Sequence, residues 1–102
     1  MIKIPAIVKA ELLLGVEKSA KKEENRSKVT AFLLPFEIVP FDDSAAIHYS
    51  KIRATLEQVG AIIGPNDLLV AATSLARSAT LVTNNTKEFS RVDGLHVEDW
   101  TC

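Results

Sequence analysis

The chain has 102 residues, enough for one domain and too few for two. Hydrophobic residues make up 47% of it and charged residues 25%, the proportions of an ordinary globular protein rather than a disordered segment. Twelve Lys and Arg against thirteen Asp and Glu give a formal net charge of −1, which excludes a strongly basic arm that binds nucleic acid by charge alone. An enzyme that contacts a few phosphates from a local patch stays compatible with this balance.

Two further features concern the cellular compartment. No apolar run approaches the roughly 20 residues that cross a bilayer, and the opening MIKIP has no apolar core of signal-peptide length. The only cysteine, Cys102, is the last residue, so an intrachain disulfide cannot form. We therefore expect a cytoplasmic protein without a membrane partner.

The first forty residues predict a short strand, two helices and a second strand. The strand covers residues 2–4, and Pro5 suits the first turn of a helix over residues 6–19. The polar stretch 18–28 is interpreted as a solvated connection to a second helix, over residues 24–34, which Pro35 ends. Residues 37–41 are strand-like.

The remaining residues predict two longer helices and two strands. Asp42, Asp43 and Ser44 supply caps for a third helix that reaches Val59 and stops at Gly60. Its apolar residues recur at helical spacing and predict one buried stripe, formed by Tyr49, Ile52, Leu56 and Val59. A fourth helix begins at Pro65 and ends near residues 75–77, and strands follow at 80–83 and 95–98. Strands separated by helices favour a single α/β domain with parallel pairing.

In a parallel α/β sheet, ligands gather beyond the carboxyl ends of the strands, and three places there carry candidate polar groups. Glu11 lies within an apolar arc of its helix, where a buried carboxylate needs a cation, a donor or water. The wheel alone favours a rim position, where Glu11 is paired with a lysine or solvated. Asp67 lies in the first turn of the fourth helix, where the helix dipole alone accounts for an acid. Ala71 and Ser74 share its face and are small enough to leave room for a ligand or ion.

The third place is Thr83-Asn84-Asn85, directly after a strand. It fits either an ordinary turn or hydrogen bonds to a metal-bound water or a phosphate. Other residues carry less: His48 and His96 have no partner at metal-ligand spacing, and the chain contains no phosphate-cradling glycine loop, Ser/His/Asp set or zinc spacing. Four basic residues could hold phosphates or be plain surface charges: Arg53, Arg77, Lys87 and Arg91.

Taken in order, the segments resemble a PIN domain of the VapC toxin type. The resemblance covers essentially the whole chain, through AELLLG (10–15), FLLPF (32–36), VPFD (39–42), IRATLE (52–57), IGPNDLLVAA (63–72), TLVTNNTKEF (80–89) and VDGLHVEDW (92–100). It implies a three-layer fold, with a parallel sheet flanked by helices. It also implies a metal-dependent endoribonuclease of a bacterial toxin–antitoxin pair that binds Mg²⁺ or Mn²⁺, dimerises and is silenced by a VapB-type antitoxin.

The resemblance also assigns residues. Glu11 and Asp67 match the family's acids and would bind the metal, whereas Asn85 matches a position that is Asp or Asn in relatives, and Thr83 lies beside the same pocket. Divalent cations of this kind prefer hard oxygen ligands, which such a cluster supplies. RNA would be the substrate.

The chain departs from the family at its start. Relatives open with a central strand that carries the first metal-binding aspartate, and nothing of that kind precedes Met1. We therefore expect an N-terminally truncated domain with a gap between the strands at 2–4 and 80–83, and with lower stability than a complete relative. A non-catalytic PIN remnant that binds an antitoxin or another PIN chain is the alternative function. An unrelated α/β phosphate-binding or receiver-like domain is disfavoured, because the paired acids and terminal lysine it needs at strand ends are not apparent.

Overall fold

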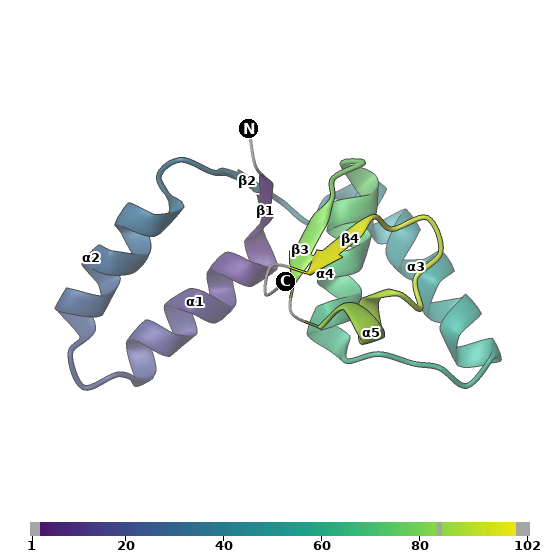
Figure 1. The fold of residues 1–102 in the computed structure, drawn as a ribbon, viewed down its shortest axis with the longest axis horizontal. Coiled ribbons are helices and arrows are strands. Elements are labelled where there is room, and N and C mark those ends of the chain that lie inside the picture. Colours follow the sequence, from purple (N-terminus) through teal and green to yellow (C-terminus); the bar gives the residue numbers. More distant parts are fainter. Residues whose placement is uncertain (1–2, 84, 100–102) are drawn as a thin grey trace. The chain divides into compact units, whose positions relative to one another are not determined.

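A computed structural model describes residues 3–83 and 85–99. The chain divides into two compact units, Met1–Pro40 and Phe41–Cys102, and each is described by itself. Figure 1 shows the elements of both units in chain order. The strands form two two-stranded parallel sheets, one in each unit, which confirms the predicted parallel pairing.

In the first unit, one strand precedes a helical hairpin in the sequence and a second strand follows it. Strand β1 (Lys3–Pro5) leads into α1 (Ala6–Lys18), then α2 (Lys22–Leu33) and β2 (Glu37–Val39). β1 pairs with β2 in the register Lys3↔Glu37, Ile4↔Ile38 and Pro5↔Val39. The apolar core is small: Val16, Leu33 and Val39 are its buried hydrophobic members.

Two predictions about this unit are wrong. Pro5 is the last strand residue and precedes the helix, because its ψ of 141° is extended rather than helical. The polar stretch 18–28 is mostly helix, since α2 already begins at Lys22. Charged pairs at helical spacing stabilise this polar surface, as in Arg26 with Glu23 and Lys28 with Glu24. Solvation of the stretch is as expected, but only residues 19–21 connect the two helices.

The second unit has two packed helices at its centre, α3 (Asp43–Gln58) and α4 (Pro65–Ala76). Asp42 caps α3 as predicted, because its Oδ1 accepts the backbone N–H of Ala45 over 3.0 Å. Its other carboxylate oxygen accepts from Arg77, which follows the end of α4, over 3.0 Å. Asp42 therefore joins the beginning of one helix to the end of the other.

The predicted stripe of α3 is only half right. Ile52 and Leu56 are buried, Tyr49 is half-buried, and Val59 is 69% exposed. The helix ends at Gln58, and Gly60 follows in the left-handed conformation with φ +69°. Val59 thus lies beyond the last helical turn and no longer follows the helical repeat.

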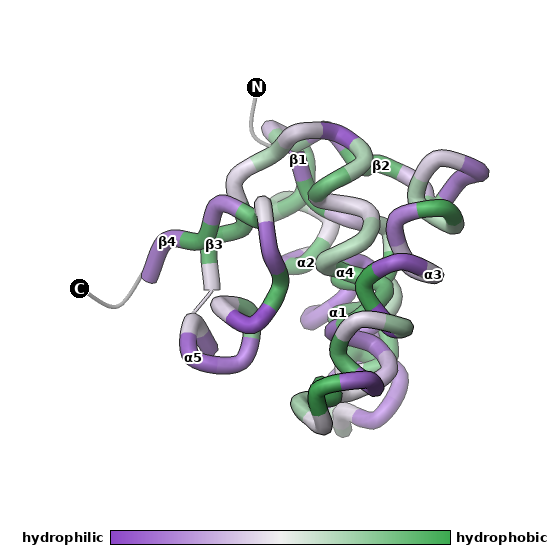
Figure 2. Tube along the Cα trace, turned by 90° about the vertical axis from the view of Figure 1, so that its right-hand side faces the viewer, coloured by the Kyte–Doolittle hydropathy of each residue, from purple (hydrophilic) through white to green (hydrophobic). Residues whose placement is uncertain are grey.

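Strand β3 (Leu81–Thr83) pairs with β4 (Val97–Asp99), and the short helix α5 (Thr86–Phe89) lies between them in sequence. Helix α5 was not predicted from the sequence. Figure 2 shows the apolar β3 in green and the polar α5 mostly in purple. Lys87 and Glu88 therefore lie on a helical turn, and Asn85 is the residue that precedes it.

Candidate functional site

The four candidate site residues are divided between the two units. Glu11 is an exposed residue of α1, in the Met1–Pro40 unit. Asp67, Thr83 and Asn85 belong to the Phe41–Cys102 unit, whereas Asn84 lies outside the described residues. The exposure of Glu11 agrees with the rim position and its route to water.

Asp67 is half-buried in the first turn of α4. Gly64 precedes the helix and Pro65 occupies its first turn, so the carboxylate lies where free backbone N–H groups favour negative charge. Ala71 and Ser74 are 0% and 3% exposed, and the Ser74 hydroxyl donates to the Val70 carbonyl oxygen. These two small residues belong to the packed core, so the expectation that they leave room for a ligand is wrong.

The neighbour of Asp67 is Glu88, a residue that the sequence analysis missed. Glu88 is hydrogen-bonded to Asp67, and its Oε1 also accepts the backbone N–H of Gly64 over 2.9 Å. A Cβ atom built on Gly64 would lie 3.4 Å from Oδ2 of Asp67 and 3.8 Å from Oε1 of Glu88. The two carboxyl groups therefore converge beside a residue that has no side chain. We call Asp67 and Glu88 the carboxyl pair.

The surroundings of Glu88 favour its ionised form. The Gly64 N–H lowers the pKa of Glu88 below its ordinary value, while partial burial acts in the opposite direction. Hydrogen bonds from Asn85 and Asp67 and the positive charge of Arg91 lower the pKa further. A divalent cation bound between the two acids would remove the repulsion between their negative charges.

Asn85 and Thr83 support this arrangement from the end of β3. The Asn85 side-chain nitrogen donates to Oε2 of Glu88 over 2.6 Å. The backbone N–H of Asn85 donates to the Thr83 hydroxyl over 3.1 Å, which forms the turn between strand and helix. Thr83 is half-buried and Asn85 exposed. The local hydrogen bond with Thr83 agrees with the turn, whereas a hydrogen bond to a metal-bound water or a phosphate stays a prediction.

A sequence signal for Glu88 was present. Asn85 and Glu88 have the spacing of a helix cap and an acid three residues later, which marks the start of a helix even when the helix is short. Among the described residues, no group of three or more His, Cys, Asp and Glu side chains that could hold a metal is found.

The four basic candidates differ in how they are held. Arg53 donates to Glu57 over 2.9 Å and to the Tyr49 hydroxyl, and these bonds raise the pKa of Arg53. Arg77 is paired with Asp42. Arg91 donates to the backbone oxygen of Ile62 over 3.3 Å and its charge also acts on Glu88, and Lys87 is exposed without an ion pair among residues 3–83 and 85–99. Arg91 and Lys87, both near α5, are the cations that remain available for phosphates.

Comparison with known proteins assigns this fold to a family. The model of the PIN domain family matches residues 1–95, and the chain belongs to that family. It is 52% identical over 99 residues to a Rickettsia felis protein named Ribonuclease VapC2, covering 97% of this chain and 74% of the relative. It is 40% identical over 97 residues to the tRNA(fMet)-specific endonuclease VapC of Salmonella typhimurium, covering 95% and 74%.

Solved structures show the same fold. VapBC2 from Rickettsia felis, bound to a DNA fragment from its promoter, matches with a TM-score of 0.93 and 50% identity, covering 98% of this chain and 75% of that one. DNA-bound VapBC from Salmonella typhimurium matches with a TM-score of 0.92 and 40% identity, covering 96% and 74%. The predicted PIN-like α/β fold is confirmed. No helix in the described part of the chain is long and apolar enough to cross a membrane.

Proposed function

We propose that the protein is a VapC-type toxin, a metal-dependent endoribonuclease of a type II toxin–antitoxin system. The observation that carries this proposal is the carboxyl pair, formed by Asp67 of α4 and Glu88 of α5. It occurs in a chain that is 52% identical to a protein named Ribonuclease VapC2. Family membership alone would establish the fold but not the chemistry. Two converging carboxyl groups supply the chemistry that a ribonuclease of this kind needs.

The metal would be Mg²⁺ or Mn²⁺. Asp67 and Glu88 would hold it with carboxylate oxygens, the ligands that both ions prefer, and Glu11 is the further ligand that the resemblance to the family predicts. A bound ion of this type supplies activation of the attacking water and compensation of charge at the scissile phosphate.

The chain's own residues prepare this site. The Gly64 N–H fixes one oxygen of Glu88 and the Asn85 amide fixes the other, so the carboxylate has one preferred orientation before any ligand arrives. Arg91 places positive charge near Glu88 and would attract a phosphate to the same region. Thr83 holds the turn that carries Asn85. An RNA strand bound here would thus meet both acids of the carboxyl pair and the positive charge of Arg91.

The partners follow the same reasoning. The Salmonella relative is named as an endonuclease specific for tRNA(fMet), so tRNA is the first substrate to test. The solved relatives are VapBC toxin–antitoxin complexes, and we propose a VapB-type antitoxin and a homodimer for this chain, in the cytoplasm. Leu14, Phe32 and Leu34 of the first unit are more than half exposed and offer apolar surface for such contacts.

The test is Mn²⁺-dependent cleavage of tRNA and other structured RNAs. Wild type is compared with Asp67→Asn and Glu11→Gln, purified identically to expose contaminating nucleases. Cleavage by wild type that falls at least a hundredfold in Asp67→Asn supports the proposal. Equal cleavage by all three would assign the activity to a contaminant and overturn it.

The second candidate is a non-catalytic PIN protein that captures an antitoxin or another PIN chain. The exposed apolar residues of α1 and α2 favour it, because binding needs that surface and no metal. Variants of the two site acids discriminate the two functions, because a catalytic toxin would bind a VapB-type antitoxin as well. If neither Glu11→Gln nor Asp67→Asn changes the biological effect while antitoxin binding persists, the binding function is correct.

A further inference from the structure

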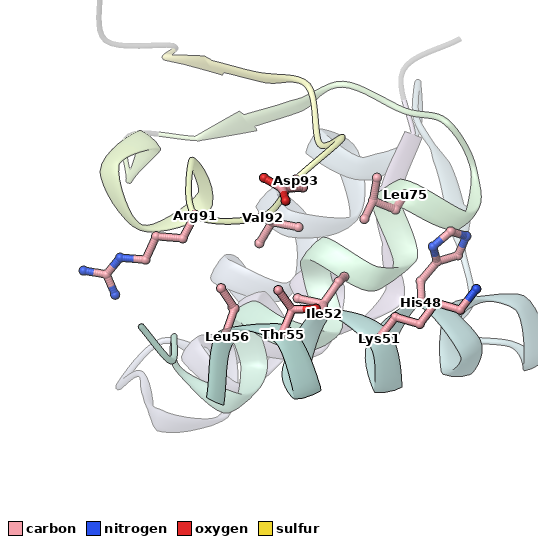
Figure 3. A pocket seen from close by; sticks show the side chains of 9 residues that line it. All are labelled: His48, Lys51, Ile52, Thr55, Leu56, Leu75, Arg91, Val92 and Asp93. Atoms are coloured by element: carbon pink, nitrogen blue, oxygen red, sulfur yellow. The ribbon is translucent and has the colours of Figure 1, made fainter. Parts of the chain in front are cut away.

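A small cavity opens in the second unit, between α3, the end of α4 and the residues that follow α5 (Figure 3). Its volume is about 230 Å³, below the ~300–1,000 Å³ of sites for drug-sized ligands. Ile52, Leu56 and Val92 are buried and Leu75 is half-buried, and together they give it an apolar floor. The cavity therefore suits one flat ring system rather than an extended ligand.

The rim of the cavity is polar and carries more cations than acids. His48 and Lys51 of α3 lie at one end, and Arg91 lies at the other with its guanidinium group directed away from the floor (Figure 3). Asp93 is the one acid of the lining. Lys51 is exposed and makes no ion pair within the described residues, so its charge is free for a ligand. An anion that extends past both ends would meet a cation at each.

Arg91 connects this cavity to the carboxyl pair. Its side chain lines the cavity, while its backbone N–H donates to the Glu88 carbonyl oxygen over 3.2 Å. Its guanidinium donates to the Ile62 carbonyl oxygen, in the segment that leads into α4 and Asp67. The cavity and the carboxyl pair are thus neighbouring parts of one surface of this unit.

We propose that the cavity holds one nucleoside of the RNA substrate, beside the phosphate that is cleaved. The apolar floor packs against the face of the base, as apolar surfaces do in sites that accept unstacked bases. Lys51 and Arg91 neutralise the phosphates on either side, and Thr55 and Asp93 offer hydrogen-bonding groups to the base edge. This inference rests on the proposed function and extends it from the cleaved bond to the neighbouring nucleotide.

The first experiment locates the RNA without any cleavage. A tRNA transcript with 4-thiouridine at scattered uridines is irradiated with the full chain in EDTA, and the crosslinked peptides are identified by mass spectrometry. Crosslinks to residues 52–56 or 91–93 support the proposal. Crosslinks confined to other peptides overturn it.

The second experiment measures tRNA binding in EDTA at several salt concentrations. Lys51→Gln removes one phosphate contact, so the slope of log K against log salt falls by about 0.7–0.9, whereas exposed Lys22→Gln leaves it unchanged. Thr55→Trp fills the cavity and weakens binding about tenfold, and Ala54→Trp on the exposed surface of the same helix is its control. Near-ultraviolet circular dichroism and urea melts confirm that the variants fold.

The outcomes separate this inference from the proposed function. If Mn²⁺-dependent cleavage needs Asp67 but Lys51→Gln and Thr55→Trp bind tRNA like their controls, the nucleoside site is wrong and the ribonuclease stands. If wild type does not cleave, the function fails, while the crosslinks still decide whether the cavity holds RNA. Loss of antitoxin binding in both cavity variants, with RNA binding unchanged, would assign the cavity to a protein and overturn the inference.

Discussion

The backbone N–H of Gly64 donates to Oε1 of Glu88 over 2.9 Å, a hydrogen bond between residues 24 positions apart. It joins Gly64, the residue before α4, to the middle of α5, and so brings Asp67 of α4 next to Glu88 of α5. Because Gly64 has no side chain, the space between the two carboxyl groups, where a Cβ would lie 3.4 Å from Asp67 Oδ2 and 3.8 Å from Glu88 Oε1, is free of one. One backbone hydrogen bond thereby builds the carboxyl pair.

We predict that Glu88→Ala destabilises the protein by about 1–3 kcal/mol, because the Gly64 N–H loses a charged acceptor in a partly buried place. Glu88→Gln keeps a neutral acceptor and costs less. Urea unfolding followed by circular dichroism measures both, and exposed Glu98→Ala in the same unit is the control. Equal midpoints for Glu88→Ala and Glu98→Ala would contradict this role of Glu88.

Asp42 provides a second test of a residue that joins two elements. Its side chain caps α3 and accepts from Arg77, so Asp42→Ala loses both contacts and should cost about 1–2 kcal/mol. Asp42→Asn keeps a capping oxygen and loses the charge, and should cost about 0–1 kcal/mol, the usual range for an exposed ion pair. Thermal melts of the two variants decide the order. A larger loss in Asp42→Asn than in Asp42→Ala would show that the cap is not the main contribution.

The two ends of the predicted stripe on α3 should respond differently to truncation. Leu56 is buried against α4, so Leu56→Ala removes apolar contacts and leaves a cavity, at a cost of about 2–5 kcal/mol. Val59→Ala lies in an exposed place and should change stability by less than about 0.5 kcal/mol. Chemical denaturation of both variants provides the comparison. A loss above 2 kcal/mol for Val59→Ala would mean that this residue is covered in solution.

Local chemistry explains what the sequence could predict. Pro65 after Gly64, Asp42 before α3 and Gly60 after it are signals that act within a few residues, and the helix bounds they predict are close to those observed. The stripe of α3 failed at Val59 because a helical repeat carries no information about where the last turn ends. Helix α5 was missed because four residues give too short a pattern to show periodicity.

The candidate site was predictable only in part, for a similar reason. Asp67 and Asn85 stand at recognisable places, the start of a helix and the end of a strand. Glu88 becomes a neighbour of Asp67 only through the tertiary contact with Gly64, which no local pattern contains. The buried state of Ala71 and Ser74 is likewise a property of the packing between α3 and α4. Small side chains on a helix face predict close packing as readily as they predict a ligand.

Metal binding should be visible as stability, independently of cleavage. A ligand that binds only the folded protein adds about 2.7 kcal/mol at a hundredfold excess over its Kd, which raises the melting temperature of a domain of this size by several degrees. We therefore expect Mn²⁺ to raise the Tm of wild type and EDTA to reverse the rise. Asp67→Asn and Glu88→Gln should each lose most of the shift, because each removes one of the two converging carboxylates.

Glu98→Gln is the matched control for this experiment, since it removes one exposed carboxylate of the same unit and should keep the full shift. Differential scanning fluorimetry over a Mn²⁺ series gives the four titration curves. The same loss in Glu98→Gln as in Asp67→Asn would reveal nonspecific binding to negative charge. A full shift in both Asp67→Asn and Glu88→Gln would place the metal elsewhere on the chain, because the remaining carboxylate alone does not have the ligands to hold it as tightly.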